Sequence, residues 1–548
     1  MSVRNLKQVA VLGLLVFVFG SSPKDILAQS KDTIPTKQAI PELPGDEVEV
    51  IKNFKARLAE TQRMRIIPEV PIHWQEPLDY NYEVNVRGLS LDYLPPVIRP
   101  LAMKSDPPAA NYNTDLKFGY GYPHFSVASV NSAYTLMDNL VLGVNYDHQA
   151  ARNDQKIVPQ YYEHVGKVYA DYELSEILSI RADFDVDIDR HALVGVDSIS
   201  NLNQDTRMFQ GGLILRPAKN AELNYDYDAH ISFSNKGLVT LDQSENWFRT
   251  GVGAMYDLGK VSFGGIVDYD RIAYDGDTLD ALNSLQLIPS AQYGQSSWNL
   301  DVGFNFLFEN GKVNYLPKIN AQFKILESKL IANVFADSDT KFNSWHQSTE
   351  YNPYLSQILN NRNQKTIKLG LGASGQVNTL TYQIQGGYKI GRDIQFFELE
   401  ETSLVDDVYM YVANSTSANS PFVEWSAKYG INKLISVELE GYYQNYTDST
   451  GTSLNGINDV FLQMGIPVSF LEDKLTIKPE ARWIGNIARE VELDHSGFFD
   501  IGLDANYEIG ERFGVFADVR NLLNSDNERW ANYPSLGIQV AGGVNLKL

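Results

Sequence analysis

The chain contains no cysteine. Disulfide bonds, Cys-ligated zinc, iron–sulfur clusters, thiol catalysis and an acylated N-terminal cysteine are therefore excluded. Basic residues are also scarce, because 46 Lys and Arg stand against 68 Asp and Glu and the formal net charge is −22. Proteins that bind duplex nucleic acid neutralise its phosphates with Lys and Arg, so we expect no nucleic-acid partner.

Long hydrophobic runs are missing from almost all of the 548 residues, and the mean hydropathy is −0.26. A membrane helix needs about 20 consecutive apolar residues, so a bundle of such helices is excluded. The one long run, residues 9–20, follows Arg4 and Lys7 and precedes the small residue Ala28. This order predicts a secretory signal peptide over residues 1–28, cleaved near Ala28. A single anchor helix is the weaker alternative, because the run is too short to span a bilayer.

Proline is rare in most of the chain. Twelve of the 22 prolines lie in residues 1–108, and the other ten are spread over the rest. Long strands exclude proline from their interiors, whereas open segments tolerate it. We therefore expect residues 29–113 to be a proline-rich periplasmic or lumenal segment, either a vestigial plug or a linker, and residues 114–548 to hold long strands.

Strict alternation of polar and apolar residues fills the proline-poor part. In residues 298–306 every even position is apolar and every odd position is polar or glycine, and residues 222–233 alternate in the same way. This period of two is the signature of a strand whose faces meet different environments. The same pattern recurs in residues 140–147, 382–390, 435–444, 475–483, 499–508 and 536–548.

Short turns and long polar connections alternate between these strands. Short turns are expected at 137–139, 175–176, 218–220, 258–260, 327–328, 378–379, 431–432, 472–473 and 510–511. Longer loops are expected at 195–205, 275–295, 339–364, 398–421 and 447–459. Short turns at one end and long loops at the other are typical of outer-membrane barrels.

The predicted fold is all-β, a transmembrane antiparallel up-and-down β-barrel over residues 114–548. It should have about 22 strands, within a range of about 18 to 22. The count reaches 22 if residues 311–317 form a short strand of their own. A secreted propeller or sandwich is the alternative. Strands of about 10 to 16 residues and the lack of a motif at a fixed period count against it.

The polar face of the barrel is predicted to point inward and to line a pore. Charged side chains facing lipid would be costly, whereas a water-filled lumen accepts them. The predicted pore-lining ladder consists of Arg181, Asp183, Asp185, Asp187, Asp189, Glu222, Asp226 and Asp228. Carboxylates along a pore attract cations and repel anions, so cations or neutral solutes should pass in preference.

No catalytic site is expected. The eight histidines are scattered, and neither a Gly-x-Ser-x-Gly nor a His-Glu-x-x-His motif occurs. Acidic residues at 268–270 and 275–280 offer oxygen ligands for calcium but lack the spacing of an EF-hand, so we interpret them as solvated acidic segments. The sequence predicts no enzyme, no metal and no cofactor.

The end of the chain resembles a known family. Residues 516–524 (FADVRNLLN), residues 528–534 (ERWANYP) and the closing strand look like the C-terminal hairpin, final loop and last strand of TonB-dependent receptors, especially those of Bacteroidetes. The tripeptide Val86, Arg87 and Gly88 also matches an element of the plug of these receptors. The resemblance implies a 22-stranded barrel in the Gram-negative outer membrane, here with a reduced or absent plug.

The resemblance also implies partners and a function. Glu47, Val48, Glu49, Val50 and Ile51 are similar to the short strand by which such receptors bind a TonB-type energiser through strand addition; an ordinary extended linker is an equal alternative. The final residues, 543–548, are typical of sequences read by the barrel-assembly machinery. Outer-membrane lipid is the remaining expected partner.

The expected function is uptake or passage of a small solute across the outer membrane. One alternative is a structural or accessory barrel in a larger envelope complex, where a surface or periplasmic protein would be the partner. The other is a passive, cation-preferring porin.

Overall fold

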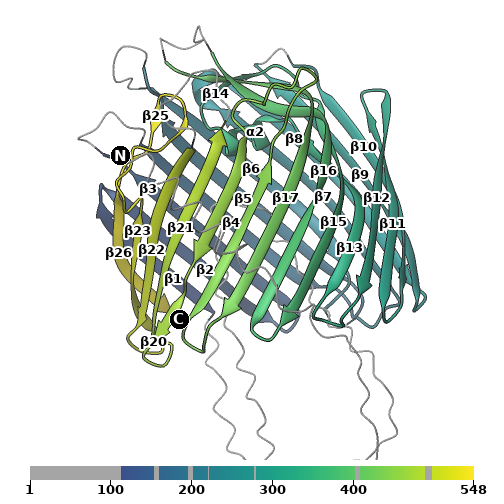
Figure 1. Ribbon diagram of the computed structural model, residues 1–548, viewed down its shortest axis with the longest axis horizontal. Coiled ribbons are helices and arrows are strands. Elements are labelled where there is room, and N and C mark those ends of the chain that lie inside the picture. The colour runs from purple at the N-terminus through teal and green to yellow at the C-terminus, as the bar shows by residue number, and fades with distance from the viewer. Residues whose placement is uncertain are drawn as a thin grey trace, which may run out of the picture. The chain divides into compact units, whose positions relative to one another are not determined.

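The computed structural model describes residues 113–153, 160–195, 202–219, 221–276, 279–400, 408–487 and 497–548. Its main feature is a closed antiparallel β-barrel of 22 strands (Figure 1). The first strand, β1 (Thr114–Tyr122), pairs with β2 (Phe125–Met137) on one side and with the last strand, β26 (Gln539–Lys547), on the other. This pairing closes the sheet, so the predicted fold class and strand number are confirmed.

The other strands of the circuit follow in chain order. They are β3 (Leu140–Ala151), β4 (Tyr161–Glu173), β5 (Ser179–Ala192), β6 (Asn203–Arg216), β7 (Tyr225–Leu238), β8 (Gln243–Asp257), β9 (Val261–Asp275), β10 (Leu282–Gly294), β11 (Trp298–Glu309), β12 (Lys312–Lys324), β13 (Ile331–Phe342), β15 (Asn363–Val377), β16 (Leu380–Leu399), β17 (Tyr411–Gly430), β18 (Ser436–Gln444), β19 (Asn458–Gly465), β21 (Leu475–Ile487), β22 (Gly497–Glu508) and β23 (Phe513–Arg520).

Shorter elements complete the described part of the chain. The strand β14 (Leu355–Ile358) pairs in parallel with β17, and β20 (Val468–Phe470) pairs with β21 beyond the end of β19. The strands β24 (Glu528–Trp530) and β25 (Tyr533–Pro534) form a separate hairpin. Two short helices lie in connections, η1 (Val239–Leu241) and α2 (Trp345–Tyr351). No helix among the described residues is long and apolar enough to cross a membrane.

The two ends of the barrel differ. One end, called here the turn end, carries the predicted short turns, such as those at 258–260 and 378–379. The other, the loop end, carries most of the long connections, including 343–362, 400–410 and 521–538. Three connections at the loop end are short, among them the turn at 310–311 between β11 and β12.

Two of the predicted loops contain long stretches of barrel strand, and each of these stretches contains a proline, Pro289 or Pro421. The strand β10 occupies most of the predicted loop at 275–295, and the first half of β17 occupies part of the predicted loop at 398–421. Pro289 lies inside β10 and pairs with Gly265 on β9, and the next residue, Ser290, pairs with Gly303 on β11. A Cβ atom on either glycine would lie 3.1 Å from a carbonyl oxygen of the proline segment. The glycines therefore let the neighbouring strands approach closely, and the barrel tolerates a proline that the sequence pattern interprets as a break.

The alternation predicted for the strands fits their exposure. On β7, Phe233 points outward and is 51% exposed, whereas Lys236 on the other face is 3% exposed. On β11, Phe304 is 43% exposed and Asn305 is 2% exposed. Apolar side chains thus cover the outer face, and polar side chains occupy the inner face.

Candidate functional site: the closed mouth of the barrel

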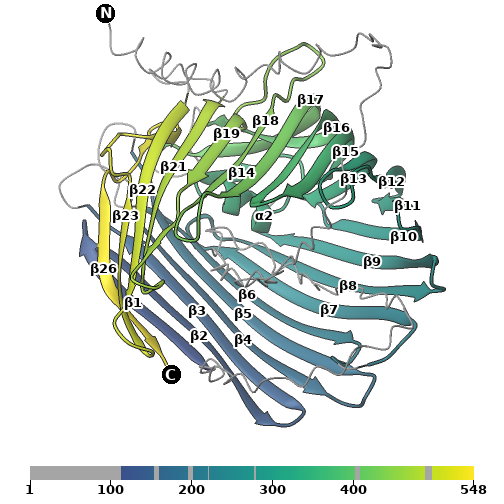
Figure 2. The ribbon, with the colours of Figure 1, turned by 60° about the horizontal axis from the view of Figure 1, so that its bottom comes forward.

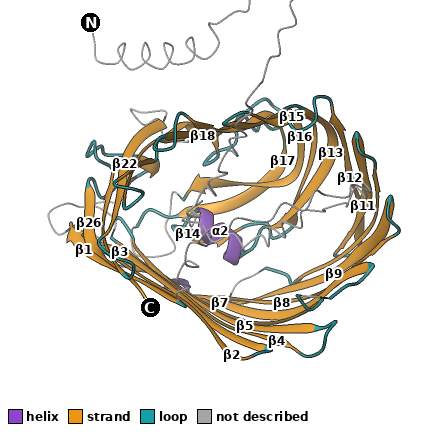
Figure 3. Ribbon diagram, turned by 90° about the horizontal axis from the view of Figure 1, so that it is seen from below, coloured by secondary structure: helices purple, strands orange, loops and turns teal. Residues whose placement is uncertain are grey.

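Part of the wall folds into the barrel at its loop end. The strands β12 and β13 pair over six residues only. The paired stretch begins with Ile319 opposite Ala336 and ends with Lys324 opposite Ile331. Beyond Ala336, β13 pairs with β15 alone and leaves the wall. We call residues 337–367, which include the loop-end parts of β13 and β15 together with α2 and β14, the infolded segment. Figures 2 and 3 show α2 and β14 inside the ring of strands.

Contacts with the inner face of the adjoining wall, from β8 to β10, hold the infolded segment in place. The Thr340 hydroxyl donates a hydrogen bond to Gln286 Oε1 on β10, at 3.2 Å. Phe342 packs against Trp247 on β8, with ring centroids 4.8 Å apart, and Ile272 and Leu282 complete this apolar cluster. Side chains of β13 that would otherwise face lipid are therefore buried against the inside of the barrel.

Buried charges add a second attachment. Lys365 Nζ on β15 lies 2.8 Å from Glu309 Oε2 on β11 and 2.8 Å from Asp393 Oδ2 on β16. Glu309 also accepts the backbone N–H of Asn363 at 2.6 Å. Lys365 and Glu309 are 5% and 7% exposed, so removing one partner would leave the other charge buried, which costs about 3–5 kcal/mol. This group ties β15 to β11, the strand next to the β12 strand that β13 has left.

The short helix α2 is fixed at its first residues. Ser344 precedes it in an extended conformation, and its hydroxyl accepts the N–H of Gln347 at 3.3 Å, which is the arrangement of an N-cap. Glu245 on β8 accepts the backbone N–H of Trp345 at 2.6 Å and that of His346 at 3.4 Å. A strand of the wall therefore supplies the acceptor for N–H groups that a helix start leaves unpaired.

His346 and Glu350 lie one turn apart on α2, with Nε2 and Oε1 separated by 3.7 Å. Burial lowers the pKa of His346 to about 3, and the nearby charges of Lys236 and Arg249 act in the same direction. Burial also raises the pKa of Glu350. The imidazole is therefore neutral at physiological pH, and the pair is not a strong ion pair there.

Loops from opposite walls meet across the mouth. In the circuit, β5 and β6 lie about half-way round from β16 and β17, yet Gly195 and Val408 form a β-bridge and the N–H of Tyr409 bonds to the Val194 carbonyl at 2.9 Å. Gln204 on β6 also donates to the carbonyl of Leu355 on β14, at 3.2 Å. These bonds span the lumen from one side to the other.

An apolar core fills the space between these loops. Trp345, Leu355, Ile358 and Met410 are 0% exposed in this cluster. Its other buried members are Leu193, Leu238, Tyr354, Phe397, Val408, Tyr411, Ala413, Trp530 and Tyr533. Tyr354 and Tyr533 stack with centroids 3.5 Å apart, and the Tyr533 hydroxyl donates to the Tyr409 carbonyl. Side chains in a core of this kind pack as they do in the interior of a small domain, and they join the loops across the mouth.

The acidic ladder predicted from the sequence is interleaved with basic residues. Asp183, Asp185, Asp187 and Asp189 lie on β5, and Asp185 is 3.2 Å from Lys167 on β4. Arg181 Nη1 is 3.6 Å from Asp171. The other predicted members lie around β7: Asp226 and Asp228 within the strand, and Glu222 before it, exposed in the turn-end connection. The role of these residues in a pore stays a prediction.

Other predicted features are placed only in part. Residues 1–28, the segment 29–112 and the energiser strand from Glu47 to Ile51 lie outside the described residues. His230 lies between Asp228 and Asp268, at 3.8 and 3.7 Å, and His191 packs near Tyr161 and Tyr354. The structure groups no three metal-ligating side chains within the part of the chain that it describes.

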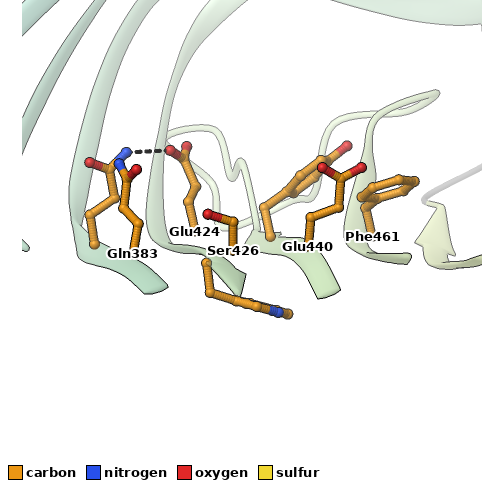
Figure 4. Close-up of a pocket in the computed structure, with 9 residues that line it drawn as sticks. Gln383, Glu424, Ser426, Glu440 and Phe461 are labelled. Carbon is orange, nitrogen blue, oxygen red and sulfur yellow. Dashed lines mark hydrogen bonds between the residues drawn. The ribbon is translucent and has the colours of Figure 1, made fainter. Parts of the chain in front are cut away.

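A hollow of about 360 Å³ lies in the inner wall, where β16 to β19 run side by side. Figure 4 shows Gln383, Glu424, Ser426, Glu440 and Phe461 around it. Glu424 accepts a hydrogen bond from Gln385 at 2.6 Å and lies 3.1 Å from Lys389. Polar side chains thus continue along the lumen below the closed mouth.

The sequence pattern predicts an ordinary loop at 339–364, so the infolded segment was not predicted. A signal was present: Ser344 followed by Gln347 is a capping-box pattern, and it precedes a run that contains Trp345 and Tyr351. Loops with a helix start and large apolar residues are expected to pack, because such residues are rarely left in solvent.

Comparisons with known proteins support the fold. No family model and no curated protein sequence matches the chain. Solved structures that resemble it include the copper transporter OprC, with a TM-score of 0.61 and 12% identity over 80% of this chain and 83% of that chain. A variant of the ferric enterobactin receptor PfeA from Pseudomonas aeruginosa gives 0.60 and 10% identity over 79% and 80%, respectively. The FrpB iron transporter from Neisseria meningitidis gives 0.61 and 11% identity over 80% and 82%. The chain therefore has the fold of the TonB-dependent receptor barrels, as the resemblance predicted.

Proposed function

We propose that the chain is an outer-membrane barrel that passes a small solute, and that the infolded segment is its gate. The fold it shares with outer-membrane transporters and its polar inner face support passage. The observation that carries the gate is the set of bonds and the apolar core that join opposite walls across the mouth. An always-open, passive porin is disfavoured, because a packed apolar core joins opposite walls at the loop end.

The proposed direction of passage follows from the two ends. Short turns face the periplasm and long loops face the outside in barrels of this type. The gate would then close the outer entrance, and a solute would have to displace or bypass the infolded segment to enter.

Deleting the gate tests this function. Residues 344–361 would be replaced by a short Gly-Ser linker, and both proteins would be reconstituted in planar bilayers. The unaltered barrel should show almost no conductance, and the deletion should raise the conductance at least tenfold. A heat-modifiability gel would check that the deletion variant still forms a barrel. A folded variant that stays closed would refute the gate.

The energiser is a further part of the proposal. Strand addition between residues 47–51 and a TonB-type protein would supply the work that opens the gate. Val48→Pro and Val50→Pro should each abolish uptake by whole cells, since proline removes a backbone donor. Unchanged uptake in both variants would reject energised transport and leave passive passage or an accessory role.

An accessory role in a larger envelope complex is the second candidate. It is favoured by one observation: residues 312–318 of β12 pair with no described strand on the side where β13 has left the wall.

A further inference from the structure

The wall of the barrel has a seam at the loop end. The strand β12 pairs with β11 along its whole length, from Lys312 opposite Glu309 to Phe323 opposite Trp298. On its other side β12 pairs with β13 only from Ile319 to Lys324. Residues 312–318 of β12 therefore have no strand partner on that side among the described residues. This edge lies where β13 would continue if it did not turn inward.

The backbone direction along β12 shows which groups are unpaired. The N–H of Lys324 bonds to the Ser297 carbonyl next to β11, and the N–H of Ile325 bonds to the Leu330 carbonyl next to β13. Backbone groups point to alternate sides along a strand, so even residues face β11 and odd residues face the place of β13. The N–H and C=O of Val313 and Tyr315 therefore point out of the free edge, together with the carbonyl of Pro317.

This free edge lies within the apolar belt. The outward residues of β11 are apolar along the whole strand up to Phe308, next to the short turn at 310–311. Val313 and Tyr315 continue the outer face on β12 and are 42% and 68% exposed. A tilted strand needs about 9–11 residues to cross the hydrocarbon, so Tyr315, opposite Phe306, lies inside this crossing. Open sheet edges are not found in contact with hydrocarbon, because lipid offers the backbone no hydrogen bonds.

The sequence of this segment is that of an edge strand. Pro317 has no N–H, and it stands at an odd position, where the missing donor would have faced the free edge. Lys312 and Lys318 stand at the two ends of the segment, and lysine is a residue by which natural sheets discourage indiscriminate edge pairing. Inside the barrel, Leu316 is 5% exposed, so the segment is packed on its inner face. Within the part of the chain that the structure describes, only the edge of this segment lacks a partner.

We propose that the free edge of β12 over residues 312–318 binds an extended strand of a second outer-membrane polypeptide. The partner strand would run toward the loop end, antiparallel to β12, and would continue the ladder that β12 and β13 begin at the turn end. It would turn apolar side chains to the lipid beside Val313 and Tyr315. This inference goes beyond solute passage, because the seam lies in the wall and not in the lumen.

A second copy of the chain does not fit this edge. Two copies inserted in the same orientation present β12 strands that run in the same direction, from the loop end to the turn end. They could not continue the antiparallel ladder of β12 and β13. The partner is therefore a different polypeptide, with a strand of the opposite direction.

Hydrogen exchange tests whether the edge is covered in the membrane. The amides of residues 312–318 should exchange rapidly in the full chain purified in detergent. They should exchange at least tenfold more slowly in native outer-membrane vesicles. Slow exchange in the purified chain would overturn the proposal, because the chain itself would then cover the edge. Rapid exchange in both preparations would overturn it as well.

Photo-crosslinking tests the occupant. Benzoylphenylalanine at Val313 should give one adduct of defined mass in native membranes, whereas the same label at Phe263, an outward residue on a strand paired on both sides, should give none. Tyr315→Pro removes the N–H at the free edge but no bond to β11, so it should reduce the adduct at least tenfold. Tyr315→Phe keeps that N–H and should leave the adduct unchanged.

Heat-modifiability of both variants would check that the barrel has formed. An adduct that survives Tyr315→Pro would refute strand pairing, because contact would then be through side chains alone. An adduct of twice the mass of the chain would refute the proposed occupant in favour of a second copy.

Discussion

The gate can be loosened at one residue, Trp345. Its side chain is 0% exposed in the core that closes the mouth. Replacing a buried tryptophan with alanine costs about 3–5 kcal/mol, from lost burial and the cavity that remains. Trp345→Ala keeps the backbone N–H that Glu245 accepts, so the loss falls on the packing of the core alone.

The expected effect is a large shift from closed to open. Each 1.4 kcal/mol changes an equilibrium tenfold, so about 3–5 kcal/mol raises the ratio of open to closed mouths by a factor of roughly 10² to 10⁴. The hydrogen-bonded ladder of the 22 strands is untouched, so the barrel should stay folded. Single-channel recordings in planar bilayers should therefore show frequent openings where the unaltered protein shows few.

Trp345→Phe is the matched control. The indole Nε1 of Trp345 is buried without a hydrogen-bond partner among the described residues. Leaving such a donor unpaired costs about 1–3 kcal/mol, so phenylalanine removes a penalty while it loses part of the ring. The closed state should then change by less than about 1 kcal/mol. Equal, low conductance in the alanine and phenylalanine variants would refute the idea that this core holds the gate closed.

Three further changes probe the same mouth and lumen. Cysteines placed at Gly195 and Val408 should form a disulfide, because these two residues form a β-bridge and lie within disulfide reach. The chain has no other cysteine, so this disulfide would be the only one, and it should abolish opening until a reductant is added. Acid should favour opening, because burial in the docked helix lowers the pKa of His346 to about 3. Below about pH 6.5, His346 is therefore protonated when the helix is undocked but stays neutral when it is docked, and the proton stabilises the open state. His346→Gln should remove most of that rise in conductance between about pH 6.5 and pH 4. In a gate-deleted barrel, Asp183→Asn with Asp187→Asn should reduce the cation-to-anion permeability ratio, measured as a reversal potential, whereas an unchanged ratio would contradict a cation-selective ladder.

The period of two was enough to predict the barrel. In a sheet that lies between lipid and a polar lumen, side chains along each strand must alternate between apolar and polar. Residues 298–306 could therefore be predicted as a strand without knowledge of the neighbouring strands. The same rule failed where a neighbour compensates for the residue. Pro289 looks like a break until Gly265 is known to lie opposite it, and Gly303 opposite its neighbour Ser290.

The closed mouth could not be predicted, because it depends on contacts between distant parts of the chain. The side chains of Lys365 and Glu309 form a buried ion pair and are 5% and 7% exposed. In the sequence, each looks like an ordinary surface charge. Gly195 and Val408 meet only because the barrel brings opposite walls within reach of their loops. Local patterns therefore predict the wall, and the long-range closure of the sheet decides what fills it.

The closed mouth and the open seam have one cause. If β13 continued along β12 in its present register, Ser338 would lie opposite Pro317 and Thr340 opposite Tyr315, with both hydroxyls facing lipid. In the infolded segment Ser338 is 3% exposed and Thr340 bonds to Gln286 instead. The loop-end residues of β13 cannot close the mouth and complete the wall at the same time. A partner strand bound at the edge of β12 would therefore favour the closed mouth. If the mouth opened by the return of β13 to β12, that return would displace the partner strand. The two processes are thus linked, and each must weaken the other by the same free energy.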